Sequence, residues 1–283
     1  MRGIIMSKIS FTTMGTPAQD GFEAIKIAKK FGFDGVDLRV SEVKGELTPE
    51  SSDDDILALK RAFDSEGIQS AGLFCYGKRG IPVDDENYWS IFTDKLKREL
   101  HIGSVLGSPS IRMFGGDISG YSSEENYIED MGKAITSALD AFPDMQIVLQ
   151  NHCGSFTFLN GVKLSKLLNN DRFGIAFSFD HCYLMQENRE DVLAVAKEHT
   201  KQLYLSDIKL DPDGKTNDNN YLVGSSIMPG QGDIQNELAL SAVGGKDFEG
   251  WITFKWEKIW HDELEEHDVA FPHFLNYLKE ILN

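Results

Sequence analysis

The chain has 283 residues, of which 41% are apolar, enough to bury a sizeable core in one large domain over residues 1–283. Its 45 acidic and 28 basic residues give a net charge of −17 and an isoelectric point near 4.8, which disfavours nucleic acid and anionic membrane surfaces as partners. No apolar run approaches the ~18 residues of a membrane span, and the N-terminal one is too short for a secretion signal. We interpret residues 1–5 as a tail before a second methionine, Met6.

In chain order, strand-like and helix-like segments alternate from one end of the sequence to the other. The prediction is strand 8–12, helix 22–31, strand 36–40, a helix marked by Ile56, Leu59 and Phe63, strand 68–76, helix 88–106, strand 110–114, helix 124–142, strand 146–150, helix 161–168, strand 174–180, helix 189–199, strand 202–206, helix 233–240, strand 251–256 and helix 269–282.

Eight strand–helix units in series predict an α/β fold with parallel strands and right-handed crossovers. Eight units predict a closed (β/α)8 TIM barrel, with its site at the carboxyl ends of the strands. The alternative is an open doubly wound sheet, which we disfavour because MGTPAQDG, after the first strand, lacks the Gly-x-Gly-x-x-Gly spacing. The segment 210–232, rich in Asp, Asn, Gly and Lys, is predicted to be a loop over the barrel mouth.

The three cysteines, Cys75, Cys153 and Cys182, form an odd and sparse set. Such a set argues against a disulfide framework and fits a reducing compartment, so we expect a cytoplasmic protein. No spacing typical of a zinc site links them, and we interpret them as small buried side chains.

Four polar residues near the ends of consecutive strands share one face of the predicted sheet. Because side chains alternate along a strand, Gln150, Asp180, Tyr204 and Lys255 point away from their apolar neighbours and would converge in a closed barrel. An amide, a carboxylate, a phenol and an amine make a polar site, but a poor site for a divalent metal.

Several segments resemble the xylose-isomerase-like TIM barrel superfamily, which includes sugar isomerases and epimerases, inosose dehydratases and apurinic-site endonucleases. VLQNH resembles the fifth-strand motif Leu-Glu-Asn-His, FSFDH the sixth-strand motif ending in Asp, and YLSDIK the seventh-strand motif His-Leu-Lys-Asp. PGQGDI and GWITFKWE resemble the turn and the eighth strand that follow, and SIRMFGG resembles the fourth strand. The likeness spans nearly the whole chain and implies the same barrel.

Metal-dependent members of that superfamily hold Mn, Mg or Zn with Glu, Asp, His and Glu from strands five to eight. At the matching positions this chain has Gln150, Asp180, Tyr204 and Lys255, so one expected ligand remains. The lysine brings its own positive charge to the place of the ion, and like charges repel strongly in a low-dielectric pocket. We therefore expect no metal and no other cofactor.

Our hypothesis is a charge substitution, in which Lys255 supplies the positive charge, Asp180 pairs with it, and Tyr204 and Gln150 complete a hydrogen-bonding ring. A desolvated lysine can act as an acid, a base or a Schiff-base nucleophile. The alternative is a structural ion pair left after the decay of a metal site.

Two histidines follow these strand ends. His152 matches the Asn-His pair of the family's fifth strand and is a candidate for proton transfer near neutral pH. His181, directly after Asp180, is a weaker match, because relatives often have histidine at the position of Tyr183; we take it as a candidate substrate contact. The alternative for both is a loop histidine bonded to the backbone.

Charged residues on other strands are further substrate-binding candidates. Arg112 and Arg39, with Asp37, alternate onto the polar face of their strands and either clamp an anionic substrate group or form an internal salt bridge. Glu257 lies two residues past Lys255 and can share its face further out. The neighbouring seventh-strand carboxylate, Asp207, faces away and is interpreted as structural.

The resemblance implies isomerisation or epimerisation of a small polyhydroxylated carbonyl substrate through an enediol. Lys255 or His152 would move protons, and Lys255 would stabilise the oxyanion. Two alternatives stay open: a dehydratase or lyase that uses Lys255 as a Schiff base, and a non-catalytic sugar-binding protein with a decayed metal site. The acidic charge and the missing zinc ligands disfavour an endonuclease. The sequence leaves the oligomeric state open, a homo-oligomer included.

Overall fold

The structure is a computed structural model and describes residues 7–42, 45–77, 86–116, 118 and 121–282. Residues 1–5 and Met6, interpreted above as a tail and a second start, lie outside the described residues. No helix in the described ranges is both long enough and apolar enough to cross a membrane.

Eight parallel strands close into a barrel in the order β1-β10-β7-β6-β5-β4-β3-β2. The pairing of β1 with β10 closes the sheet, which confirms the predicted (β/α)8 barrel and excludes the open doubly wound sheet. The strands are β1 (Lys8–Thr12), β2 (Gly35–Arg39), β3 (Gln69–Phe74), β4 (Ser110–Phe114), β5 (Gln146–Gln150), β6 (Phe173–Ser178), β7 (Thr200–Leu205) and β10 (Trp251–Phe254).

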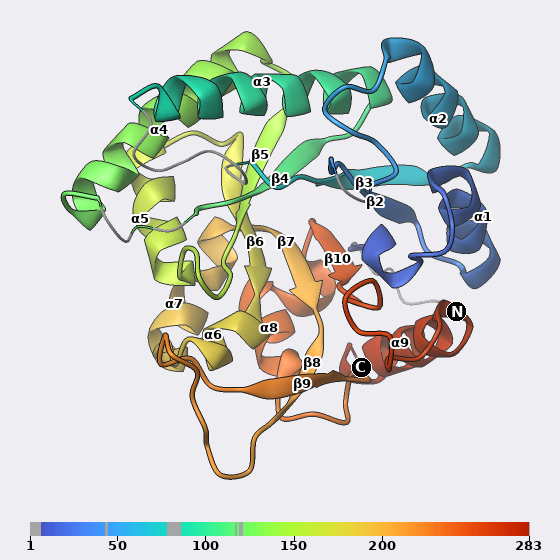
Figure 1. Cartoon of the computed structure of the whole chain (residues 1–283). Coiled ribbons are helices and arrows are strands. Elements are labelled where there is room, and N and C mark those ends of the chain that lie inside the picture. The colour runs from blue at the N-terminus through green and yellow to red at the C-terminus, as the bar shows by residue number, and fades with distance from the viewer. Residues whose placement is uncertain (1–6, 43–44, 78–85, 117, 119–120, 283) are drawn as a thin grey trace.

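Helices surround the barrel on its outside (Figure 1). Local capping residues define the ends of these helices. At the N-terminal ends, the Ser52 and Ser123 hydroxyls accept hydrogen bonds from first-turn backbone amides. At the C-terminal ends, Gly32 and Gly67 adopt positive φ angles of 86° and 69°. The helices are α1 (Gly21–Phe31), α2 (Asp53–Glu66), α3 (Tyr88–Leu106), α4 (Glu124–Ala141), α5 (Phe158–Leu168), α7 (Arg189–His199), α8 (Asn236–Val243) and α9 (His267–Ile281), with short 3-10 turns η1 (Thr13–Gly15) and η2 (Gly245–Asp247).

Inside the barrel, below the carboxyl ends of the strands, inward-facing residues form a polar network. The main apolar core lies between the strands and the helices, and a smaller apolar cluster includes Tyr204. Ser10 Oγ lies 2.8 Å from Thr253 Oγ1, and Gln202 Nε2 donates to Thr253 Oγ1 at 2.9 Å and to Asp37 Oδ2 at 3.1 Å. Tyr204 Oη donates to the same Asp37 oxygen at 2.7 Å. These bonds satisfy part of the polar surface that the inward-facing positions bury.

The sixth strand is shorter than predicted, because β6 ends at Ser178 and a short helix, α6 (Phe179–Leu184), follows at once. Asn151 causes this end: its Oδ1 accepts from Ser178 N at 2.8 Å and its Nδ2 donates to Ser178 O at 2.8 Å. The side chain of Asn151 thus takes up both backbone groups that a continuing strand would use. Asp180 is therefore a helix residue rather than a strand end.

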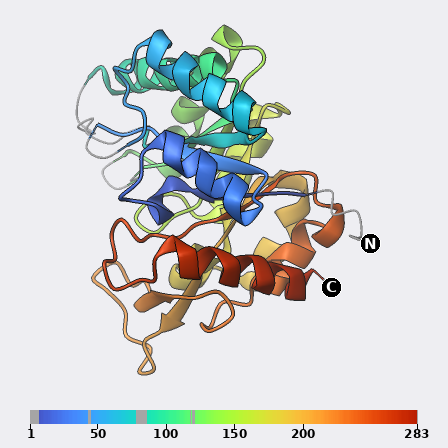
Figure 2. The same ribbon diagram turned by 90° about the vertical axis from the view of Figure 1, so that its right-hand side faces the viewer.

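The predicted loop 210–232 is partly ordered as a β-hairpin. Strands β8 (Asp207–Leu210) and β9 (Gly224–Ile227) pair antiparallel, and the hairpin projects beyond the carboxyl ends of β6 and β7 (Figure 1). Leu222 N donates to Leu184 O of α6 at 2.8 Å, which fastens the hairpin to the mouth. The segment after it lies next to α9 (Figure 2), where His273 Nε2 donates to Pro229 O at 2.7 Å.

Candidate active site

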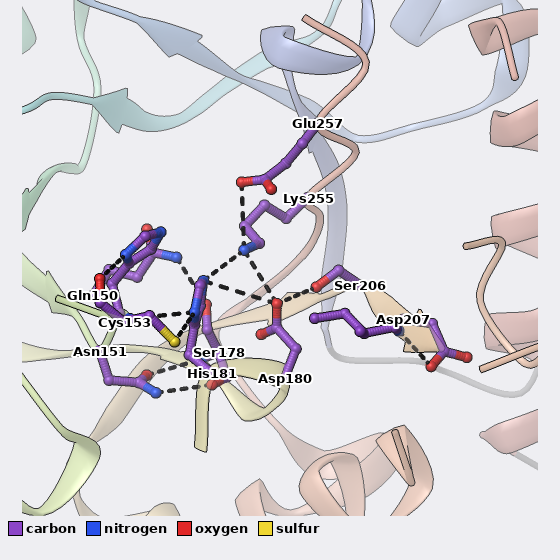
Figure 3. Close-up of polar contacts among 12 residues, drawn as sticks. Gln150, Asn151, Cys153, Ser178, Asp180, His181, Ser206, Asp207, Lys255 and Glu257 are labelled. Atoms are coloured by element: carbon purple, nitrogen blue, oxygen red, sulfur yellow. Dashed lines mark hydrogen bonds and ion pairs between the residues drawn. The ribbon is translucent and has the colours of Figure 1, made fainter. Parts of the chain in front are cut away.

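Lys255 follows β10 directly, and its ammonium group is buried at the barrel mouth. Its Nζ lies 3.2 Å from Asp180 Oδ2, 3.0 Å from His181 Nε2 and 3.6 Å from Glu257 Oε1 (Figure 3). The side chain is 2% exposed and points toward these groups rather than toward the outer helices. The structure thus joins four of the residues that the sequence singled out.

Ser206, one residue past β7, completes this group, although the sequence pattern did not distinguish it from Tyr204. Its hydroxyl donates to Asp180 Oδ2 at 2.7 Å (Figure 3). Thr253 pairs with Tyr204, and Lys255 N donates to Leu205 O at 3.0 Å, so the lysine stands level with Ser206. The inward-facing residue of the seventh strand that reaches the mouth is therefore a serine.

Tyr204, predicted to be part of the ring, instead lies one layer deeper in the barrel. It is fully buried and donates to Asp37 rather than to Asp180. The reason is register, since Tyr204 and Ser206 share one face of the strand and the later residue lies nearer the mouth. The alternation in the sequence places both Tyr204 and Ser206 on the inward face, but it does not determine which of these two residues lies level with Lys255.

Gln150 lies beside the group without contacting Lys255. Its Nε2 donates to Ser178 Oγ at 2.9 Å, and its buried Oε1 has no hydrogen-bond partner within the described part of the chain. Asp180 Oδ1 is likewise buried without a partner there. Two acceptor oxygens are therefore available in a buried site, where an unmet hydrogen bond is costly.

The pKa values of the central pair favour a full ion pair. Burial lowers the pKa of Lys255, but Asp180 and Glu257 raise it by more, so its pKa lies above the usual value. Burial also raises the pKa of Asp180, and the charge of Lys255 outweighs this and holds that pKa well below its usual range. At neutral pH the site therefore contains an ammonium and a carboxylate.

Both histidines are neutral at neutral pH. Burial, with the nearby charge of Lys255, lowers the pKa of His152 to about 4, and burial lowers that of His181 well below its ordinary value. His152 Nδ1 donates to Cys153 O at 2.8 Å, which leaves Nε2 as the basic atom of that ring. The two imidazole rings pack with centroids 3.9 Å apart, so His152 lies one ring away from Lys255.

The cysteines take no part as thiolates. Cys75, Cys153 and Cys182 are free, and burial with the charge of Asp180 raises the pKa of Cys153 to about 12. Cys153 N and Sγ each lie 3.4 Å from His181 Nδ1, so this residue positions the imidazole. Cys75 and Cys182 are buried as predicted, whereas Cys153 is partly exposed.

A cavity of about 170 Å³ borders the ion pair. Ser206, Glu257 and His261 form part of its wall, and Ser226 of the β8–β9 hairpin covers another part. Its volume is below the ~300 Å³ that is usual for drug-sized ligands, which indicates a small polar ligand.

Arg112 does not line this cavity, and within the described residues it forms no salt bridge. It is 1% exposed, donates from Nη1 to Cys75 O at 2.8 Å, and lies 3.1 Å from the ring centroid of Phe74 and 4.0 Å from that of Phe114. Its Nε and Nη2 are buried without a hydrogen-bond partner among the described residues. Burial lowers the pKa of this guanidinium.

Arg39 is also buried away from the cavity. Its guanidinium lies 5.6 Å from the ring centroid of Trp260 and 5.9 Å from that of Tyr76. Over the described ranges, no ion pair joins either arginine to Asp37, so the predicted internal salt bridge does not form. Aromatic rings surround both guanidinium groups instead.

Asp207 is structural, as predicted. Its carboxylate accepts the amides of Gly230 at 2.8 Å, Gly232 at 3.0 Å and Ile234 at 3.1 Å, so it fixes the turn after the hairpin. Burial nevertheless raises its pKa, because all of these donors are neutral.

The residues at the strand ends do not fit a divalent metal ion. The carboxylates of Asp180 and Glu257 converge on Nζ of Lys255, so an ion placed between them would meet an ammonium group within about 4 Å. In the part of the chain that the structure describes, no three His, Cys, Asp or Glu residues are arranged to hold a metal. The donor set is suited to hydrogen bonding with a ligand instead.

Comparisons with known proteins agree with this architecture. A family model described as a xylose isomerase-like TIM barrel matches residues 25–273. No curated protein matches the sequence. Among solved structures, an IolI protein with a bound zinc atom has a TM-score of 0.77 and 17% identity, over 97% of this chain and 98% of that one.

Two further solved structures are similar over nearly their whole lengths. D-psicose 3-epimerase with D-tagatose, from Clostridium cellulolyticum H10, has a TM-score of 0.73 and 14% identity, over 98% of this chain and 99% of that one. The probable 3-DHS dehydratase AsbF from Bacillus anthracis has a TM-score of 0.68 and 13% identity, over 98% and 99%. At such identities the likeness shows the fold alone.

Proposed function

Since this chain belongs to the xylose isomerase-like TIM barrel family, we propose that it binds a small sugar or sugar-derived carbonyl compound and isomerises or epimerises it without a divalent metal. The supporting observation is the ammonium of Lys255, buried between Asp180 and Glu257 beside a cavity at the mouth. The similarity to a D-psicose 3-epimerase supports the substrate class. The three free cysteines fit a reducing compartment, and we include a cytoplasmic location in the proposal.

Lys255 acts in this proposal as a fixed positive charge. When a proton leaves the carbon next to a carbonyl group, negative charge develops on the carbonyl oxygen, and an oriented ammonium stabilises it. The raised pKa of Lys255 keeps the amine protonated, so it acts as a hydrogen-bond donor rather than as a base.

His152 is the base in this proposal. It lies behind the cavity lining, stacked on His181, so the substrate must extend past His181 to reach it. The pKa of His152, about 4, leaves the imidazole neutral, and Nε2 is its accepting atom because Nδ1 donates to a carbonyl group. The ring takes a proton from the carbon beside the carbonyl, and the bonding electrons move onto the oxygen near Lys255. Isomerisation follows when the proton is delivered to the former carbonyl carbon and the hydroxyl proton of the adjacent carbon passes to the enolate oxygen, which exchanges the carbonyl and hydroxyl groups. Epimerisation follows when a second donor returns a proton to the opposite face of the same carbon.

A dehydratase or lyase that forms a Schiff base on Lys255 is the second candidate, favoured by the similarity to a probable dehydratase. Schiff-base formation requires a neutral amine, and the ion pair with Asp180 makes that form scarce. A non-catalytic sugar-binding protein is the third candidate. In that case Lys255 and Asp180 would bind the sugar by hydrogen bonds without transferring a proton.

The decisive experiment offers the full chain a panel of ketoses and aldoses in D₂O, with and without EDTA, and records deuterium incorporation beside the carbonyl group. We expect exchange that EDTA does not change, that Lys255→Met abolishes, and that Lys209→Met preserves. Lys209, an exposed lysine in β8 of the hairpin, is a matched control because it also pairs with an aspartate: its Nζ lies 2.7 Å from Asp233 Oδ1.

Other outcomes separate the alternatives. Exchange that EDTA abolishes would contradict the metal-free proposal. Trapping of a sugar on Lys255 by borohydride would favour the Schiff-base route. Saturable sugar binding with no exchange for any substrate would favour the non-catalytic protein.

A further inference from the structure

A second and larger cavity lies beside α3, away from Lys255. It has a volume of about 530 Å³, within the range of small-molecule sites. The segments that follow β2 and β3 form two of its walls, and α3 forms the third. Among the described residues, it shares no lining residue with the cavity at the ion pair.

Glu99 of α3 contributes an unsatisfied acceptor to this cavity wall. The residue is 6% exposed, and its Oε1 accepts one long hydrogen bond, from Gly77 N at 3.3 Å. Its Oε2 is buried and has no hydrogen-bond partner among the described residues. A carboxylate can accept about four hydrogen bonds, so this one lacks donors that a ligand could supply.

The cations in the cavity wall are already engaged. Arg98 donates from Nε to Pro49 O at 2.5 Å and from Nη2 to Ser51 O at 2.6 Å, which fixes the segment before α2. Lys95 lies 3.9 Å from Glu42. Neither Glu50 nor Asp94 forms an ion pair within the described ranges, so among the described residues of this wall the charge left unneutralised is negative.

Tyr76, Ile91 and Val40 contribute the aromatic and apolar part of the cavity lining. We propose that this cavity is a binding site for a small primary amine with an apolar body, its ammonium group at Glu99 and its body against Tyr76. A neutral polyol could also donate to Glu99 but would leave the negative charge of the wall unneutralised. An ammonium supplies three donors and a positive charge, and an aromatic ring adds a cation–π contact.

The test titrates the full chain with benzylamine and with its neutral analogue benzyl alcohol at pH 8, by calorimetry and by amide chemical shifts. We expect saturable one-to-one binding of the amine, about tenfold or more tighter than the alcohol. Glu99→Gln should weaken amine binding by a similar factor. Glu66→Gln is the matched control, because Glu66 pairs with Lys29 on the exposed end of α2, and it should bind like the unmodified chain.

A readout in the unmodified chain makes the test independent of how the variant folds. The amide of Gly77, which donates to Glu99, should shift with benzylamine and not with benzyl alcohol. Amine affinity should also fall as the pH drops from 8 to 6, because burial raises the pKa of Glu99 to about 7 despite the facing charges of Lys95 and Arg112.

Three results would overturn the proposal. These are equal affinity for the amine and the alcohol, equal weakening by Glu99→Gln and Glu66→Gln, and amide shifts that leave Gly77 unchanged while other sites move.

Discussion

The two sides of the barrel mouth treat buried charge in opposite ways. On the side of β6, β7 and β10, Lys255 lies between Asp180 and Glu257, and Ser206 adds a hydrogen bond. On the side of β2, β3 and α3, the buried carboxylate of Glu99 has one long hydrogen bond and no ion pair among the described residues. The first side compensates its buried charges with one another, whereas the second leaves the buried charge of Glu99 without a cation in contact within the described chain.

The contrast appears in the pKa values. The charge of Lys255 holds the pKa of Asp180 well below its usual range, whereas burial raises the pKa of Asp37 to about 6 and that of Glu99 to about 7. Among the described residues, Asp37 accepts hydrogen bonds from two neutral donors, Tyr204 and Gln202. A buried carboxylate in this barrel therefore keeps a low pKa only where a cation touches it.

Removal of the cation from the compensated side should be the most damaging change. Lys255→Met leaves Asp180 buried with an unpaired charge, and we expect a loss of about 3–5 kcal/mol in the free energy of unfolding, measured by urea denaturation at pH 7. Lys209→Met, which breaks an exposed pair, should cost less than about 1 kcal/mol. Equal losses would show that the charge of Asp180 does not depend on Lys255.

Removal of the uncompensated charge should change the pH dependence of stability. The folded pKa of Glu99, about 7, exceeds its ordinary value of 4.5, so the folded chain binds the extra proton and loses stability as the pH rises through this window. Glu99→Gln should lack that loss, and relative to the unmodified chain it should gain about 3 kcal/mol between pH 4.5 and 7.5. Urea midpoints at several pH values measure this, and parallel curves for the two proteins would contradict it.

His152 should give a slope of the opposite sign. Its folded pKa of about 4 lies below its ordinary value of 6.5, so the unfolded chain binds the extra proton and stability falls as the pH drops from 6.5 to 4. His152→Gln should remove about 2 kcal/mol of this fall, after allowance for the partial exposure of the ring. His181, shifted in the same direction, should keep the remaining slope in the variant. An unchanged slope would show that His152 is already protonated in the folded chain near pH 6.

Two hydroxyl deletions give the smallest and most selective comparison. Ser206→Ala and Tyr204→Phe each remove one donor from a buried carboxylate, and each should cost about 1–2 kcal/mol of stability in thermal unfolding. Only Ser206→Ala should also change sugar binding or deuterium exchange, because only Ser206 lies beside Lys255. Loss of activity in Tyr204→Phe with none in Ser206→Ala would instead support the sequence-based prediction that Tyr204 belongs to the hydrogen-bonding ring around Lys255.

The sequence predicted the barrel and its central ion pair because both depend on regular repetition. Alternation along the eighth strand placed Lys255 on the inward face, and eight repeated units required neighbouring parallel strands. Asp180 meets Lys255 as predicted, but from helix α6 rather than from the strand that the alternation assumed. The sequence could not choose between Tyr204 and Ser206, since strand alternation gives the face but not the height at which neighbouring strands meet. That height depends on the stagger of the closed barrel.

Other features depend on contacts between residues far apart in the sequence. The end of β6 is set by Asn151, 27 residues before Ser178, and no local pattern shows that pairing. Arg112 lies among aromatic rings instead of on Asp37, a choice that the three-dimensional packing makes. The cavity at Glu99 is built from two connections and one helix, so its existence follows only from the assembled structure.

The most direct test of the charge substitution is the metal content of the purified chain, determined by elemental analysis after dialysis against a buffer with Mn, Mg and Zn. We expect far less than one divalent ion per chain, both in the unmodified protein and in Asp180→Asn. One bound ion per chain in the unmodified protein, lost in Asp180→Asn, would contradict it, because the ammonium of Lys255 would then not hold that position.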